Sequence, residues 1–190
     1  MNRRKAIGGL FAITGIGIAS FTGFKFFYGN SKAYRGQLQN YATLIAELAD
    51  VIIPPTDTPG AKEANVHEYI IGFMESCVSN KEYTNFLNGL NDLQETCLSD
   101  YNTHFAACTT EQKIVILEDL NSNVDSNSLL SKIDKKIRGR SFFTMLKSLT
   151  IEGYCSSELG ATQLLAYQPI PASYKAITKM ERNQKAWATS

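Results

Sequence analysis

Residues Leu38–Ala61 read LQNYATLIAELADVIIPPTDTPGA, and this stretch contains both a helix and the signal that ends it. Its apolar side chains recur at spacings of three and one, the pattern of an amphipathic α-helix: Leu38, Tyr41, Leu44, Ile45, Leu48, Ala49 and Ile52. Pro54 and Pro55 must end this helix, because the residue before a proline avoids helical backbone angles. The stretch therefore predicts a helix over residues 38–53, followed by a long rigid turn over residues 53–61.

The rest of the chain continues the helical pattern. We expect further helices at residues 65–77, 81–101, 109–120, 129–137, 141–154 and 159–167, with a loop at 121–128. The side chains expected to face inward on the first two are Val66, Tyr69, Ile70, Phe73 and Met74, then Tyr83, Phe86, Leu87, Leu90, Leu93 and Cys97. Thr109–Gln112 resembles a capping box, and Ser156–Glu158 can cap the last helix. No segment alternates strictly for long, so the predicted fold class is all-α.

The first residues resemble an export signal or a membrane anchor. Met1–Lys5 is basic, and Ala6–Phe24 follows without a charge, which is the layout of an export signal. The adjacent Arg3 and Arg4 indicate the twin-arginine variant. Residues 6–28 would form a helix of ~34 Å, enough to cross a ~30 Å hydrocarbon core. A cleaved signal, a retained signal-anchor and a buried core helix are the three alternatives. The predicted division is residues 1–30 as signal or anchor, 31–168 as helical domain and 169–190 as extended C-terminal arm.

Charge is distributed unevenly along the chain. There are 19 Lys and Arg against 18 Asp and Glu, but residues 1–46 contain no acid, residues 47–125 are strongly acidic and residues 126–190 are basic. The near-neutral total does not favour nucleic acid as a partner. The basic stretch Lys132–Arg140 is interrupted by Asp134, so we interpret it as a solvated helix face or as a contact for an acidic partner surface.

The residues that carry most enzyme chemistry are scarce. Cys77, Cys97, Cys108 and Cys155 form no Cys-x-x-Cys pair, which leaves zinc ribbons and haem c unsupported and leaves free thiols and disulfides both open. His67 and His104 are the two imidazoles, and there is no Gly-x-Ser-x-Gly elbow. We therefore predict no catalytic, cofactor-binding or metal residue. A metal or thiol enzyme using Cys97, His104 and Cys108 is an alternative, since His104 and Cys108 are four residues apart.

Two stretches carry a resemblance to a known family. Ala49–Ala61 reads ADVIIPPTDTPGA, and Leu149–Thr162 reads LTIEGYCSSELGAT. Both resemble the paired signatures of the gluconate 2-dehydrogenase subunit 3 family. The intervening FLNGL at Phe86–Leu90, the Phe142-Phe143 pair and the tail's Lys185–Trp187 are also similar, so the resemblance spans about residues 45–187.

The resemblance implies a function without chemistry of its own. It implies a non-catalytic small subunit of a membrane-associated dehydrogenase acting on sugars or alcohols. The large partner, of the glucose–methanol–choline type, would hold FAD and pass electrons to a cytochrome c subunit. The small subunit would help the large one mature and leave the cell, and would anchor it if residues 6–28 are retained. The expected location is the periplasm or the outer face of the bacterial inner membrane.

The same two stretches supply the candidate contact residues. Proline-shaped turns and small side chains let another backbone approach closely, although a tight helix junction within the chain explains them equally well. The predicted partner-interface residues are Pro54, Pro55, Thr56, Asp57, Thr58, Pro59, Gly60, Ala61, Gly153, Tyr154, Glu158, Gly160 and Ala161. A membrane-anchored extracytoplasmic binding module, with no oxidoreductase partner, is the other alternative function.

Overall fold

A computed structural model describes residues 35–124, 140–170, 177, 179–180 and 182–188. The predicted signal or anchor segment, including Arg3 and Arg4, lies outside these residues, as does the helix expected at 129–137. Within the described part the regular elements are helical and no strand occurs. None of the helices there combines the length and apolarity that crossing a membrane requires.

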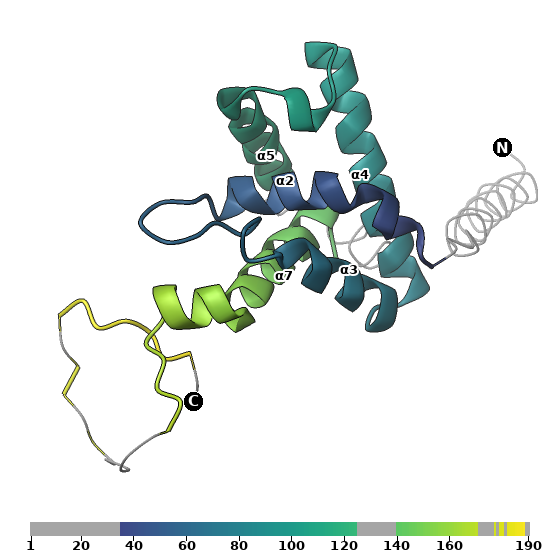
Figure 1. Ribbon diagram of the computed structural model, residues 1–190. Coiled ribbons are helices and arrows are strands. Elements are labelled where there is room, and N and C mark those ends of the chain that lie inside the picture. The colour runs from purple at the N-terminus through teal and green to yellow at the C-terminus, as the bar shows by residue number, and fades with distance from the viewer. Residues whose placement is uncertain (1–34, 125–139, 171–176, 178, 181, 189–190) are drawn as a thin grey trace, which may run out of the picture. The chain divides into compact units, whose positions relative to one another are not determined.

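Figure 1 shows the order of the described helices along the chain. Two are short 3₁₀ turns and the last is a π-helical turn; the others are α-helices. In chain order they are η1 (Gln37–Tyr41), α2 (Ala42–Ile52), α3 (Val66–Ser76), α4 (Asn80–Tyr101), η2 (Phe105–Ala107), α5 (Thr110–Val124), α7 (Phe142–Ser156) and η3 (Gly160–Leu164). This order confirms the all-α fold class expected from the apolar periodicity.

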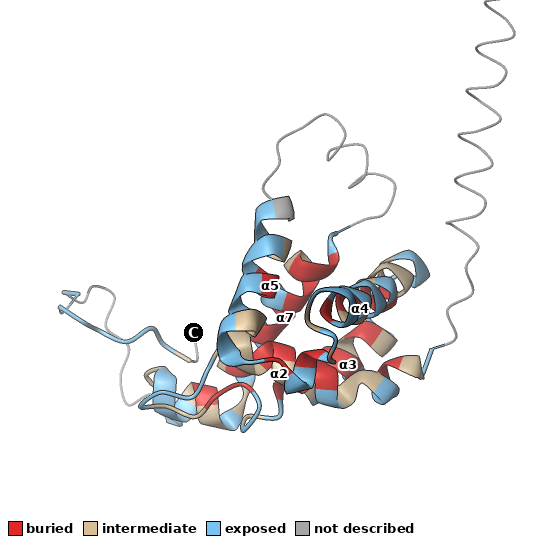
Figure 2. Cartoon of the chain, turned by 90° about the horizontal axis from the view of Figure 1, so that it is seen from above, coloured by how far each residue is buried: buried red, intermediate tan, exposed pale blue. Residues whose placement is uncertain are grey.

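Helix α7 lies at the centre of the bundle and contacts α2, α3, α4 and α5 (Figure 2). More than half of its residues are buried, as expected of a helix that other helices surround: Phe142, Phe143, Met145, Leu146, Leu149, Thr150, Gly153 and Tyr154. The Thr150 hydroxyl donates to the Leu146 carbonyl at 2.8 Å, so this polar side chain is buried with its hydrogen bond made inside the helix. The other α-helices of the described part each cover part of α7.

The apolar periodicity predicted the helix faces well. All six side chains expected to face inward on α4 are buried, and Leu38, Leu44, Ile45, Leu48 and Ala49 are buried on η1 and α2. The helix predicted over residues 38–53 begins as the 3₁₀ turn η1 and continues as α2, which ends at Ile52, two residues before Pro54. On α3 the expected Tyr69 and Phe73 are only half-buried, because Ile71 takes part of the inner face.

The caps also follow the sequence signals. Thr109 Oγ1 accepts from the Gln112 amide at 3.3 Å, and Gln112 Oε1 accepts from the Thr109 amide at 2.9 Å, which confirms the predicted capping box of α5. Several boundaries differ from expectation, and two helix ends differ by three residues or more. Helix α5 continues to Val124 through a segment expected to be a loop, where the Ser122 hydroxyl donates to the Asp119 carbonyl. The last helix stops at Leu164, where the chain becomes extended, instead of at Tyr167.

Gly89 of α4 lies against the start of α7. A Cβ atom at this position would overlap Cβ and Cγ of Phe142, which are the inner atoms of a buried ring and cannot swing aside. The Phe142 ring also packs edge-on against Phe86, with ring centroids 5.2 Å apart. The α4–α7 crossing therefore depends on a glycine, although glycine within a helix ordinarily costs stability.

This contact predicts opposite effects for the same substitution at two helical glycines. Gly89→Ala should lower the free energy of unfolding by about 1–3 kcal/mol through overpacking. Gly72→Ala is the matched control, because Gly72 is exposed on α3 with open space around its Cα. This substitution should raise the free energy of unfolding by roughly 0.5–1 kcal/mol. Urea unfolding of both variants checks this; stabilisation by Gly89→Ala would contradict the crossing.

Candidate functional site

The two signature stretches meet in space. The Tyr154 hydroxyl near the end of α7 donates to the Pro59 carbonyl at 2.5 Å, across 95 residues of sequence. Tyr154 is fully buried and Pro59 is half-buried, so this bond is partly shielded from water. The turn is also closed on itself, because the Ala61 amide donates to the Ile53 carbonyl at 2.9 Å and the Thr56 amide to the Thr58 carbonyl at 3.0 Å. The turn after α2 is thus held to the C-terminal end of α7.

The small residues of both stretches are packed against this chain itself. A Cβ at Gly60 would lie 2.6 Å from Asp50 Oδ1, and one at Gly153 would lie 2.6 Å from the Tyr69 ring. A Cβ at Gly160 would collide with the Tyr154 carbonyl oxygen. These three glycines are buried, as are Ala61 and Tyr154 of the predicted set. Their smallness is accounted for by close internal packing, and their contact with a partner stays a prediction.

Other members of the predicted set face the solvent. Pro54, Pro55, Thr56 and Asp57 are exposed on the turn, and Glu158 is exposed just after α7. The three remaining members are half-buried at the same two places: Thr58, Pro59 and Ala161. We name the exposed residues Pro54–Asp57 together with Glu158 the signature edge. The predicted set therefore consists of a buried support and an exposed edge.

Ser157 fixes the second half of this site. Its hydroxyl donates to the Tyr154 carbonyl at 2.7 Å and accepts from the Gly160 amide at 3.0 Å, so it links the end of α7 to η3. This is the capping role predicted for residues 156–158. Because the same residue, Tyr154, carries both the Ser157 and the Pro59 contacts, a shift of α7 would move both parts of the site together.

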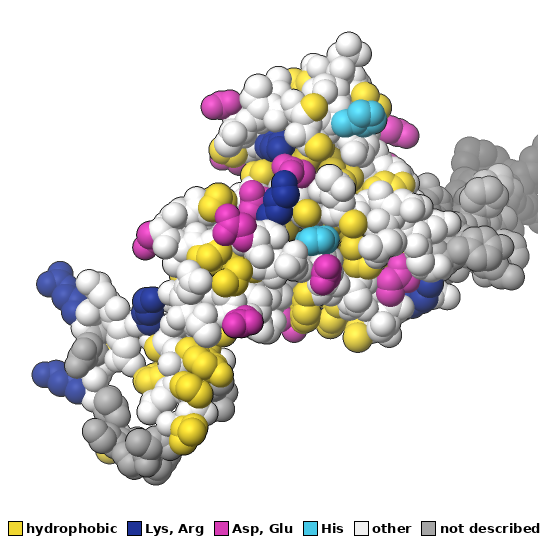
Figure 3. All heavy atoms as spheres, viewed as in Figure 1, with side chains coloured by type: hydrophobic (Ala, Val, Ile, Leu, Met, Phe, Trp, Pro, Cys, Tyr) yellow, Lys and Arg dark blue, Asp and Glu magenta, His cyan; other side chains and the backbone are white. Residues whose placement is uncertain are grey.

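Apolar side chains are exposed beside η3. The segment after η3 returns to it through a single parallel bridge, in which the Ala166 amide donates to the Ala186 carbonyl at 2.8 Å and the Ala188 amide to the Ala166 carbonyl at 3.0 Å. Figure 3 shows apolar side chains gathered next to this segment, at the lower left of the view. The large exposed ones along it are Leu164, Tyr167, Ile170, Ile177, Met180 and Trp187. Gathered exposed apolar side chains are typical of interaction surfaces.

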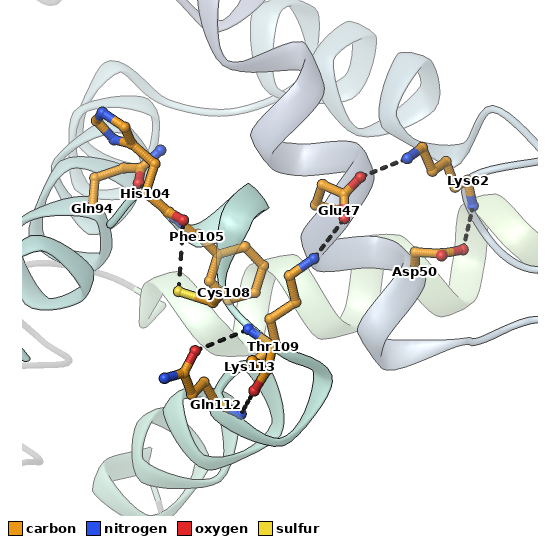
Figure 4. A network of polar contacts seen from close by, with 10 residues as sticks. All are labelled: Glu47, Asp50, Lys62, Gln94, His104, Phe105, Cys108, Thr109, Gln112 and Lys113. Carbon is orange, nitrogen blue, oxygen red and sulfur yellow. Dashed lines mark hydrogen bonds and ion pairs between the residues drawn. The ribbon is translucent and has the colours of Figure 1, made fainter. Parts of the chain in front are cut away.

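A polar network braces the other side of the turn (Figure 4). Glu47 of α2 pairs with Lys113 of α5 at 2.8 Å and with Lys62, just after the turn, at 2.5 Å. The Lys113 ammonium, followed by that of Lys62, holds the pKa of the Glu47 carboxyl below its usual range. The Lys62 amide also donates to Asp50 at 3.2 Å. These contacts link α2, α5 and the end of the turn. The charged groups of Glu47, Lys62 and Lys113 are paired with one another.

The structure does not bring Cys97, His104 and Cys108 together as one metal or thiol site. The imidazole of His104 is exposed, and in Figure 4 it points away from Cys108, which instead donates from Sγ to the His104 carbonyl at 3.6 Å. In the part of the chain that the structure describes, no three His, Cys, Asp or Glu side chains gather as a metal would require. All four cysteines are free thiols.

The described chain is therefore an all-α bundle in which two signature stretches are brought together at one end. The family model of gluconate 2-dehydrogenase subunit 3 matches residues 39–172, so the chain belongs to that family, as the resemblance indicated. The matched range runs from η1 through η3 and includes both signature stretches. Comparison with curated proteins and with solved structures finds no match.

The contact between the stretches predicts a specific loss of stability. Tyr154→Phe keeps the ring but leaves the Pro59 carbonyl without its buried donor, which should cost about 1–2 kcal/mol of unfolding free energy. Tyr41→Phe is the matched control, because the Tyr41 hydroxyl donates to Asn91 in an exposed bond, and it should cost under about 0.5 kcal/mol. Equal losses in the two variants, measured by urea unfolding, would contradict the importance of the Tyr154 contact.

Proposed function

We propose that this chain is the non-catalytic small subunit of an FAD-dependent dehydrogenase complex acting on sugars or alcohols. The flavin belongs to a large partner subunit, whose maturation and export the small subunit assists. The observation that carries the proposal is the family match together with a site that consists of an exposed edge on a buried support. An internal hydrogen bond joins the two signature stretches. Their exposed residues are therefore held in fixed positions, which suits recognition of a partner protein.

The geometry of the signature edge suits a protein partner. Two prolines and two closing hydrogen bonds hold the turn in one conformation before binding, so little conformational entropy is lost when it docks. Asp57 and Glu158 place carboxylates at the edge, and the exposed apolar side chains near η3 supply the dry area that protein interfaces contain at their centres. The expected partner surface is therefore apolar at its centre, with donor groups at its rim.

The N-terminal sequence supports the remainder of the proposal. Arg3 and Arg4 before an uncharged stretch indicate export by a twin-arginine-like route, which carries folded proteins and their complexes. One signal on the small subunit would then export both. The complex would work in the periplasm or at the outer face of the inner membrane, with residues 6–28 as anchor if retained and a cytochrome c subunit as electron acceptor.

Co-expression tests the function directly. A large flavoprotein subunit from the same organism, co-expressed with this chain, should be recovered outside the cytoplasm, loaded with FAD, only when this chain is present, and the two should co-purify. A large subunit that folds, leaves the cytoplasm and oxidises its substrate equally well alone would overturn the proposal. Replacing Arg3 and Arg4 by lysine keeps the charge; it should leave the complex intact but retain it in the cytoplasm.

Single substitutions in the same complex test the edge. Asp57→Ala and Glu158→Ala should each weaken association about tenfold, because each removes an exposed carboxylate from the interface without disturbing the buried support. Glu95→Ala, which removes an exposed carboxylate from α4, is the matched control and should leave affinity unchanged. Titration of purified subunits measures this, and affinities unchanged in all three variants would exclude the signature edge as the contact.

A further inference from the structure

Arg35, the first residue that the structure describes, is bound to the C-terminal end of α3. Its Nη1 donates to the carbonyl of Met74 at 3.1 Å and to the carbonyl of Glu75. Its Nη2 donates to the carbonyl of Val78 at 2.6 Å and to Asn80 Oδ1 at 3.2 Å. The last carbonyls of a helix have no partner inside it, and the helix dipole favours a positive charge there. The guanidinium therefore caps α3 from a distant part of the chain.

Neighbouring contacts fasten the backbone beside Arg35. The Gly36 amide donates to Glu75 Oε2 at 2.8 Å, and the Tyr83 hydroxyl donates to Glu75 Oε1 at 2.9 Å, so one carboxylate joins this backbone to α3 and α4. The guanidinium carbon of Arg35 lies 5.5 Å from the centre of the Tyr83 ring, which is a cation–π contact. Leu38, three residues after Arg35, is fully buried. The start of the described chain is therefore held by side-chain, backbone and apolar contacts together.

These contacts lie at the end of α3 that is remote from the turn after α2. Helix α2 runs from η1 to the turn, and α3, which packs against both α2 and η1, returns from it. At the turn, the Val66 amide donates to the Ala61 carbonyl at 3.1 Å. The 11 residues of α3 separate its two ends by about 16 Å. In Figure 1 the purple start of the described chain and the turn after α2 lie at opposite ends of α2.

We propose that Arg35 is a latch that fixes the exit, the place where the chain before residue 35 joins the domain, at the end of α2 and α3 opposite the turn. A partner seated on the signature edge then leaves the exit uncovered, so that an export signal in the same chain remains accessible in the complex. This last step rests on the proposed function, but the latch itself does not. Arg35 precedes the range that the family model matches, so the match does not imply the latch.

Substitution of Arg35 tests the latch without any partner. Arg35→Gln, made in the full chain in detergent, removes the charge and leaves too few donors for the four hydrogen bonds. Amide exchange of residues 36–41 should become about tenfold faster, and the Tm should fall by roughly 3–6 °C. Arg182→Gln, at an exposed arginine of the C-terminal arm, is the matched control and should change neither. An Arg35→Gln chain with unchanged exchange and unchanged Tm would overturn the latch.

Thiol labelling tests the position of the exit. Single exposed positions are converted to cysteine on η1, by Gln39→Cys, and on the turn, by Thr56→Cys. The background is the full chain with Cys77→Ser and Cys155→Ser, in which the two remaining native cysteines are buried. Maleimide should label residue 39 at the same rate in the free chain and in the purified complex with the large subunit. Residue 56 should react about tenfold more slowly in the complex, because the partner covers it.

The outcomes separate the exit from the proposed function. Slower labelling of residue 39 in the complex, whether or not residue 56 is also slowed, would show that the partner covers the exit and would overturn this inference while the proposed function stands. Two subunits that do not associate would instead overturn the proposed function. In that case the exchange rates and Tm of Arg35→Gln still decide whether the latch exists.

Discussion

The structure depends on one long-range hydrogen bond, from the Tyr154 hydroxyl to the Pro59 carbonyl. It joins the turn after α2 to the end of the central helix, and the same tyrosine's carbonyl accepts from Ser157, which positions η3. Because Tyr154 is buried, leaving its hydroxyl unpaired would carry a desolvation cost. The two stretches that resemble the family signatures are thus two halves of one packed junction.

The structural features that depend on neighbouring residues could be predicted from the sequence. The apolar spacing on α4, the prolines after α2 and the Thr109–Gln112 capping box are each written within a few neighbouring residues, and all three predictions are confirmed. The loop expected from Asn121 was wrong over its first four residues, because local Asn and Ser content weighed against a helix that in fact continues to Val124.

Contacts between distant residues were not predictable in the same way. Nothing in the spacing of Pro59 and Tyr154 shows that they meet, and nothing near Glu47 shows that it binds both Lys62 and Lys113. The glycines of the signature stretches indicated close packing. The sequence alone does not show whether the atoms packed against them belong to this chain or to another. For Gly60, Gly153 and Gly160 the close neighbours are within this chain.

The central claim is that the signature edge, standing on this buried junction, is where a large dehydrogenase subunit binds. Hydrogen–deuterium exchange of the chain, free and in its purified complex, tests it most directly. Protection on binding should concentrate in the turn at residues 56–60 and in residues 157–167 around η3, with α4 unchanged on its exposed face. Protection confined to α4 and α5, with both signature stretches exchanging as in the free chain, would contradict the account.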